Sequence, residues 1–336
     1  MVIHNAIRYN FFIMEKTKTS FKGVIILLIT ALIWGSSFIA QRFGTDSGVQ
    51  PFTFQGIRTL LGACVLLPFI FVRDAITAKK MTEEQLAERK KNNKKSVIYG
   101  AICGVVFCAA INLQQWAFVY EESAGKIAFI TAMYMFLVPI IGLFFKKRVP
   151  FVTWICVIIG FAGLYFLCIK GTGFGGINLG DWLAFGCAIF FCLQILLLER
   201  FAPDCDGIKL SCVQFLVGGF ISLILMFIFD KPDPAALKAA VIPILYSGVL
   251  SCGLAYTLQV VGQKYCEATI ASLLMCMESV FAVLSEAVII HKIPTKWEIL
   301  GCVIMFAAII ISQLSDLVKK KNNKNSEEKE NSDCEN

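Results

Sequence analysis

Two polar residues lie close together near the start of one apolar segment of the chain. Arg58 lies seven residues after Pro51, and Gln55 precedes Arg58 by one turn on the same helical face. A charge in the middle of a membrane costs about 2.5–3.5 kcal/mol on insertion scales, so Arg58 needs a reason to be there. One interpretation is an anion-binding or gating pair that faces a cavity. The alternatives are that Arg58 reaches the membrane interface along its aliphatic stem, or that it forms a structural ion pair.

Two acids lie in a second apolar segment, and they are candidates for moving a proton. Glu278 is the deeper one, roughly ten residues into its helix, and Glu286 follows about 12 Å further along the axis. A desolvated carboxyl group tends to keep its proton, so proton coupling is a hypothesis for Glu278, with Glu286 as second candidate. A structural pair of Glu278 with Arg58 or another base is the alternative.

Amide and aromatic side chains form two polar stripes. Asn112 and Gln115 share one helical face, and Tyr256, Gln259 and Gln263 share another. Either stripe could line a solute pocket, or it could serve interhelical hydrogen bonds, which are worth about 0.6 kcal/mol on average. Further candidates for the cavity wall are Trp34, Tyr134 and Gln214.

The elements that must position these residues are membrane-spanning helices. The chain has 336 residues, of which 57% are hydrophobic and only 16% charged, whereas about a quarter are charged in a soluble domain. We expect helices because they satisfy their own backbone polar groups in lipid. Ten windows reach the length of a span, about 17–25 residues. They are 23–43, 52–72, 97–119, 125–145, 150–169, 180–199, 208–229, 240–262, 268–290 and 297–317.

The net charge of +7 is explained by topology rather than by nucleic-acid binding. Basic residues are concentrated in a charged loop at 73–96, in the turn at 146–148 and near both ends, whereas the connections at 44–51 and 121–126 hold one lysine. Lysine and arginine favour the cytoplasmic side, so we expect both termini in the cytoplasm and a multi-pass protein of the plasma membrane.

Several familiar patterns carry no catalytic or metal chemistry here. Most of the fourteen cysteines lie inside the apolar windows, and we interpret them as small apolar residues that pack between helices. The Gly-x-Gly-x-x-Gly run at 171–176 has no strand before it, so we expect an outer loop and no dinucleotide site. No cofactor, metal site or catalytic residue is expected. Gly100 and Gly104 form a Gly-x-x-x-Gly pair, which serves either close packing within the chain or a homodimer.

The two halves of the chain have matching architecture. A shift of 144 residues aligns 113–165 with 257–309 and pairs Gln115 with Gln259 and Tyr134 with Glu278. Identities are few, but segment lengths and turn positions agree. Five spans is an odd number, so the second copy would enter the membrane from the opposite side. Such inverted repeats are typical of transporters with a site near the membrane midplane.

Four motifs on these segments resemble one family. They are Trp34-Gly35-Ser36-Ser37-Phe38, Pro51-Phe52-Thr53-Phe54 followed by Arg58, Gly180-Asp181, and Glu278-Ser279-Val280-Phe281-Ala282. Together and in this order they resemble the EamA family of the drug/metabolite transporter superfamily, over about 21–317. Ser279 stands where the family pattern has proline, whereas the first half keeps Pro139. Family members often carry Glu at the ends of the fourth and ninth spans. This chain has Lys146-Lys147-Arg148 and His291-Lys292 there.

The resemblance implies an all-α membrane protein with ten transmembrane helices in two inverted five-helix repeats. We expect helices 5 and 10 to be peripheral because they are uniformly apolar. The expected organisation is a cytoplasmic segment at 1–22, repeats at 23–170 and 171–317, and a disordered cytoplasmic tail at 318–336.

The resemblance also implies the function of the chain. We expect a permease for a small-molecule solute, amino-acid-like or drug-like, which works in the lipid bilayer by alternating access, with export as the favoured direction. A non-transporting sensor or assembly partner is the rival, and it would leave no cavity between the polar stripes. A membrane enzyme is a weaker rival, since no paired catalytic constellation is present.

Overall fold

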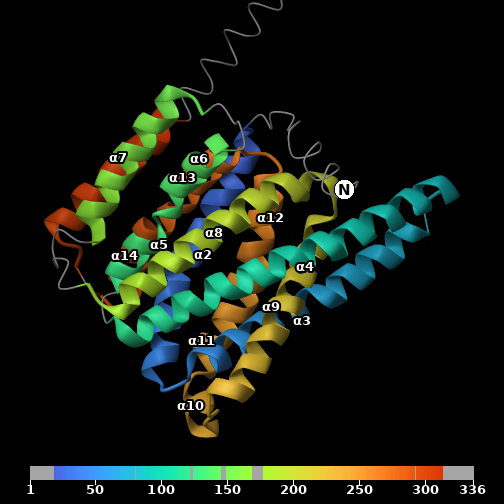
Figure 1. Ribbon diagram of the computed structural model, residues 1–336, viewed down its shortest axis with the longest axis horizontal. Coiled ribbons are helices and arrows are strands. Elements are labelled where there is room, and N and C mark those ends of the chain that lie inside the picture. The colour runs from blue at the N-terminus through green and yellow to red at the C-terminus, as the bar shows by residue number, and fades with distance from the viewer. Residues whose placement is uncertain are drawn as a thin grey trace, which may run out of the picture.

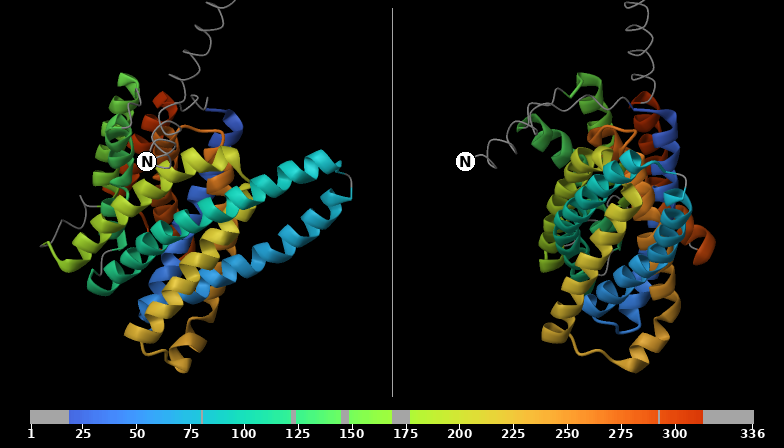
Figure 2. Two further views of the ribbon diagram at one scale, coloured as in Figure 1. Left: turned by 45° about the vertical axis from the view of Figure 1, so that its right-hand side comes forward. Right: turned by 90° about the vertical axis from the view of Figure 1, so that its right-hand side faces the viewer.

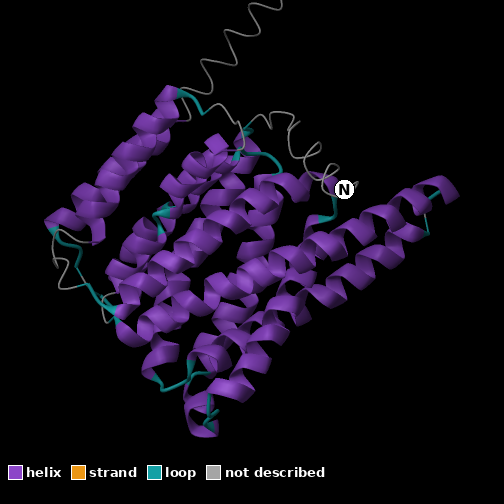
Figure 3. Ribbon diagram, viewed as in Figure 1, coloured by secondary structure: helices purple, strands orange, loops and turns teal. Residues whose placement is uncertain are grey.

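The computed structural model describes residues 19–79, 81–121, 124–144, 149–168, 177–291 and 293–312. Within these residues the secondary structure is helical throughout, without strands (Figure 3). The segment 1–18, the turn at 146–148, the glycine run at 171–176 and the tail from 313 lie outside the described residues.

The chain is built from helices of very different lengths (Figure 1). Those of the first half are α2 (Phe21–Asp46), α3 (Pro51–Ala78), α4 (Glu83–Tyr120), α5 (Ala124–Thr131), α6 (Tyr134–Phe144) and α7 (Phe151–Cys168). Those of the second half are α8 (Leu179–Phe201), η1 (Ala202–Asp204), α9 (Gly207–Phe229), α10 (Pro234–Ala239), α11 (Val241–Tyr246), η2 (Ser247–Tyr256), α12 (Thr257–Gln263), α13 (Ala268–Met275), α14 (Met277–Ile289) and a final helix at 296–312.

Eight spans in the described residues are long and apolar enough to cross a membrane, and Phe151–Leu167 is a shorter apolar helix. The prediction of an all-helical, multi-pass membrane protein is therefore confirmed. Each of the ten predicted windows overlaps a helical segment, and residues 296–312 occupy the last of them.

Two of the predicted spans are interrupted at corresponding positions. One consists of α5 and α6, which part after Thr131, and the other of α13 and α14, which part after Met275. These two residues are 144 apart, so the interruptions fall in the register that the sequence alignment predicts. The second break forms although Ser279 replaces the family's proline.

A long π-helical segment, η2, stands in the middle of the span predicted at 240–262. We expected one continuous α-helix there. A π-helix makes i→i+5 hydrogen bonds, is rare, and often marks a functional site. This segment runs beside α3 and α2, and its last residue, Tyr256, faces the protein interior.

The prediction of a charged loop at 73–96 is wrong, because these residues are mostly helical. α3 continues to Ala78 and α4 begins at Glu83, so the two form a hairpin that projects from the bundle (Figure 1). A capping box joins Thr82 and Gln85 and starts α4. Helix-favouring Lys, Arg, Glu and Ala residues then extend the helix beyond the apolar window.

Glycines bring α4 and α9 into close contact within the chain. A Cβ at Gly100 would lie 2.8 Å from the Leu210 carbonyl oxygen, and one at Gly104 would lie 2.9 Å from that of Gln214. Both glycines therefore serve packing inside the chain, which confirms one of the two interpretations of the Gly-x-x-x-Gly pair; a homodimer stays a prediction.

The most uniformly apolar helices lie at one edge of the molecule. α7 and the helix at 296–312 pack on each other there (Figure 1), with Gly163 against Met305 and Phe166 stacked on Trp297 at 5.8 Å. The predicted peripheral position of helices 5 and 10 agrees with this arrangement.

Polar contacts join the connections at one end of the bundle. Arg73 at the end of α3 pairs with Asp206 before α9, and the Lys264 ammonium donates to the Cys205 carbonyl at 2.6 Å. The Ser20 amide donates to the Tyr265 carbonyl at 2.8 Å, which places the start of α2 at the same end.

Two further pairs of connections are joined by hydrogen bonds. The Thr53 amide and hydroxyl both donate to Asp230, at 2.7 and 2.8 Å, and Asn178 donates to Glu121 at 2.6 Å. Figure 2 shows the start of α2 and the α3–α4 hairpin toward one side and α10 toward the other. The connections thus alternate between the two ends, as a chain that crosses the membrane repeatedly requires.

Candidate functional site

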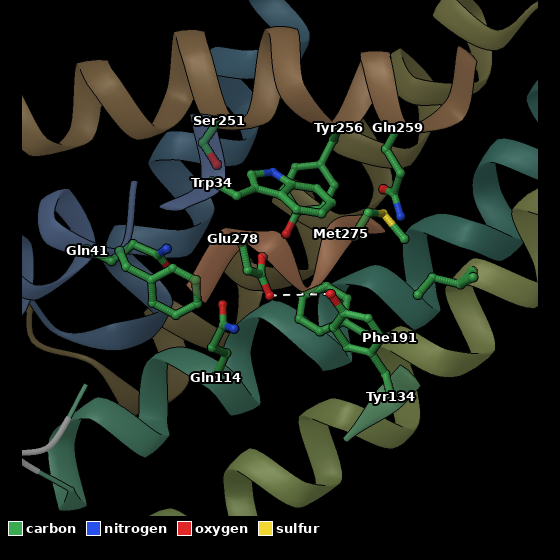
Figure 4. Close-up of a pocket in the computed structure, with 12 residues that line it drawn as sticks. Trp34, Gln41, Gln114, Tyr134, Phe191, Ser251, Tyr256, Gln259, Met275 and Glu278 are labelled. Atoms are coloured by element: carbon green, nitrogen blue, oxygen red, sulfur yellow. Dashed lines mark hydrogen bonds between the residues drawn. The ribbon is translucent and has the colours of Figure 1, made fainter. Parts of the chain in front are cut away.

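An internal cavity lies where the two interrupted spans meet α2, α4, α8 and the π-helical segment (Figure 4). Its volume of about 30 Å³ gives room for about one or two water molecules. The wall combines aromatic rings, amides and one carboxylate. The lining residues are Trp34, Phe38, Gln41, Gln114, Tyr134, Phe191, Ile195, Ser251, Tyr256, Gln259, Met275 and Glu278.

Glu278 supplies the charge in this wall. It lies in the first turn of α14, directly after the break, and only 6% of it is exposed. The unpaired N–H groups at the start of a helix favour a negative charge nearby. The Tyr134 hydroxyl, at the start of α6, donates to Glu278 Oε1 at 3.4 Å (Figure 4). The two residues that the repeat alignment pairs are therefore hydrogen-bonded to each other.

Gly35 explains how Trp34 and Glu278 come to share one wall. A Cβ at Gly35 would lie 2.6 Å from the Glu278 carbonyl oxygen and 2.7 Å from the Ala282 nitrogen. The absence of a side chain thus lets α14 lie directly against α2. The Trp-Gly part of the first motif therefore has a structural reason in this chain.

Aromatic rings form another part of the cavity wall. Trp34 packs on Tyr256 with ring centroids 4.6 Å apart, and Phe107 supports Tyr256 edge-on at 4.8 Å. The Trp34 indole nitrogen is buried without a hydrogen-bond partner in the structure. Trp34 thus packs on a neighbour and also lines the cavity.

Arg58 and Gln55 lie behind this wall and do not line the cavity. The Arg58 guanidinium is 1% exposed, its Nε donates to Gln55 Oε1 at 2.6 Å, and it lies over the Phe54 ring at 5.8 Å. Gln55 donates to Gln115 at 2.9 Å, and Gln115 donates to Thr45 at 2.8 Å. These residues form a buried chain of hydrogen bonds across α3, α4 and α2.

The structure contains no Arg58–Glu278 ion pair, so that alternative fails. Tyr256, which lines the cavity, is influenced electrostatically by both charged groups, and Arg58 is not among the lining residues. Arg58 does not reach a membrane interface either, because it is enclosed by protein.

The other predicted site residues are distributed over several contacts. Asn112 donates to Ser222 at 2.8 Å, which joins α4 to α9. Gln214 accepts from Gln194 at 3.4 Å, and Gln194 accepts from Gln259 at 3.5 Å, so Gln214 is connected to the cavity through two amides. Glu286 is partly exposed and outside the cavity wall.

Of the predicted residues, the structure brings five together in the cavity: Trp34, Tyr134, Tyr256, Gln259 and Glu278. The amides Gln41 and Gln114 were missed. Gln41 lies two turns after Trp34, a spacing that places both on one face, so the sequence contained a signal for it. Gln114 adjoins Gln115, and nothing in the sequence says which of the two turns inward.

Comparisons with known proteins agree with a transporter. The model of the EamA-like transporter family matches residues 21–169 and again 178–314. An uncharacterized transporter of Archaeoglobus fulgidus is 26% identical over 295 residues, covering 86% of this chain and 84% of that protein. An uncharacterized transporter of Clostridium kluyveri is 21% identical over 309 residues, covering 90% and 95%.

A solved structure described only as a crystal structure of a protein has the same fold. Its TM-score is 0.69 at 16% identity, with 88% of this chain and 97% of that chain covered. The fold and the cavity define a multi-pass membrane protein with a polar cavity between its helices. The two family matches together span most of the chain, and the protein belongs to the EamA-like transporter family.

Proposed function

We propose that this protein is a permease that moves a small metabolite across the plasma membrane by alternating access. The observation that carries the proposal is the cavity between the helices, whose carboxylate and aromatic residues lie at the junction of two interrupted spans. Interrupted helices that meet near the middle of the bundle are a usual way to build a solute site in transporters. A sensor or assembly partner, the rival, would fill this space with protein contacts.

Two inverted five-helix repeats are the architecture that we infer, with ten transmembrane helices and boundaries at 23–170 and 171–317. Three observations support it. The family model matches the chain twice. The two helix breaks are 144 residues apart. Connections alternate between the two ends of the bundle.

The end that carries the α3–α4 hairpin is the one that we assign to the cytoplasm, together with both termini. The hairpin is rich in lysine and arginine, including Lys90, Lys91, Lys94 and Lys95. Basic residues are retained on the cytoplasmic side. Export is the favoured direction of transport.

The size of the cavity implies that the protein must open to accept its solute. A volume of about 30 Å³ holds water but no amino acid, so side chains and helices must separate before loading. The buried polar atoms without partners, at Trp34, Gln41 and Gln259, are then available to the solute.

The test of transport is an untargeted comparison of metabolites inside and outside cells with and without the protein, followed by uptake into vesicles that contain purified protein. We expect at least one small solute to change its distribution and to move in the vesicles. No change in either assay would contradict a permease.

Proton coupling through Glu278 is part of the proposal. Titratable groups near this carboxyl among the described residues include Tyr134 from α6, Tyr256 from η2, Cys187 from α8 and Cys276 between α13 and α14, and Arg58 acts electrostatically on Tyr256. Only Glu278 among the wall residues is a carboxylic acid. Transport by the Glu278→Gln variant should lose its dependence on pH, and an unchanged pH profile would contradict coupling. Glu286 remains the second candidate.

A further inference from the structure

The charge and the hydrogen-bonding groups of the cavity wall indicate the kind of solute that fits, given that the protein is a permease. The wall contains the Glu278 carboxylate but no lysine, arginine or histidine. Among the described residues Glu278 makes no ion pair, and the Tyr134 hydroxyl gives the hydrogen bond recorded for it. A buried carboxylate without a cation is costly, and a positively charged solute would remove that cost.

Arg58 acts electrostatically on the wall residue Tyr256 but does not itself line the cavity. Its guanidinium donates to Gln55 and lies over the Phe54 ring. A solute carboxylate would therefore find no guanidinium in the wall, whereas a solute ammonium would find Glu278 directly.

The remaining wall also suits a cation. Trp34 and Tyr256 lie against each other at the cavity, and aromatic faces attract ammonium groups. The Gln41 amide nitrogen donates to the Ser37 carbonyl at 3.5 Å, and its Oε1 is buried without a partner. That oxygen is an acceptor available to an N–H donor.

From these contacts we propose that the transported solute carries an organic ammonium group. Glu278 pairs with the positive charge, and the rings of Trp34 and Tyr256 pack on the carbon atoms next to it. This assignment rests on the proposed function and narrows the solute from a small metabolite to a cationic one.

Binding by the purified full chain tests the assignment with three probes that share a phenyl ring. They are phenethylammonium, a cation at neutral pH, phenylalanine, a zwitterion, and phenylacetate, an anion. We expect the cation to bind most tightly in calorimetry. Loss of the charge in Glu278→Gln should weaken its binding by about 10- to 150-fold, the range for a hydrogen-bonded charged group.

Three variants separate the charge from the fold. Glu278→Asp keeps the charge and should retain most of the affinity. Trp34→Leu should weaken binding by about 2- to 30-fold, the range for a cation–π contact. Glu88→Gln loses an acid on the exposed part of α4 and should bind as the wild type does. Each variant is compared only if it elutes as the wild type does in size-exclusion chromatography.

Several results would overturn the assignment. They are tighter binding of phenylacetate or phenylalanine, undiminished binding of the cation by Glu278→Gln, and no binding of any probe. These results concern the solute class alone, because the metabolite and vesicle assays test transport separately. Conversely, Glu278-dependent binding of the cation without transport of any solute would leave the cation site in place and refute the permease.

Discussion

At the residue scale, the polar side chains within the membrane fall into two groups with different environments. Glu278 lines the cavity, whereas Arg58 is enclosed and held by Gln55. The Arg58 Nη1 atom is buried without a hydrogen-bond partner in the structure. A buried charge with so few contacts depends on each of them, so Gln55 should matter for stability.

Replacing Gln55 tests this dependence. Gln55→Leu removes the acceptor at 2.6 Å from Arg58 Nε and should lower the free energy of unfolding by about 1–3 kcal/mol. Gln55→Glu keeps an acceptor for Arg58 and should cost less. Thermal unfolding in detergent, followed by tryptophan fluorescence, measures both variants, and equal stability of Gln55→Leu and the wild type would contradict the role.

At the element scale, the contact between α2 and α14 positions the cavity wall. Gly35 lies against the backbone of α14 at Glu278 and Ala282, so any side chain there must move one helix. The motif residue Trp34 stands next to it and depends on the same spacing.

Gly35→Ala should therefore cost about 1–3 kcal/mol in stability, as overpacking does, and should weaken transport. The matched control is Gly186→Ala, because a Cβ there meets only Leu113 Cδ1 at an ordinary 3.4 Å. That helical position should tolerate alanine or gain about 0.5–1 kcal/mol. Thermal unfolding and vesicle uptake compare the pair, and similar losses at both positions would show that close approach at Gly35 is unimportant.

At the scale of the whole molecule, contacts between connections define two ends. The hairpin near Gln85 belongs to one end through Arg73 and Asp206, and α10 belongs to the other, just after Asp230 contacts Thr53. This arrangement is independent of the charge bias that suggests which end is cytoplasmic.

Reporter fusions give the expected orientation. Fusions of alkaline phosphatase and of a fluorescent protein after residue 85 and after residue 336 should both report the cytoplasm, and those after residue 233 the outside. If the fusions after residues 85 and 233 report the same side, the alternation of connections is contradicted. If all three fusions report the side opposite to the expected one, only the cytoplasmic assignment is contradicted.

The sequence by itself determined the helical, multi-pass class, the approximate spans and the family. These depend on local properties, since apolar length and short motifs are readable one segment at a time. It also predicted, from the 144-residue shift, that Glu278 and Tyr134 occupy corresponding positions. The prediction of a loop at 73–96 was wrong. The charged residues there are also strong helix formers, and the capping box at Thr82 starts a helix among them.

Only the tertiary structure decided which polar residues face the cavity. Adjacent residues on a helix point about 100° apart, so Gln114 and Gln115 cannot face the same neighbour. The helices packed around α4 decide that Gln114 lines the cavity and that Gln115 hydrogen-bonds with Gln55 and Thr45. The same applies to the charges. In the sequence Arg58 and Glu278 look equally suited to a solute, but packing places only Glu278 of the two in the cavity wall and holds Arg58 against Gln55 and Phe54.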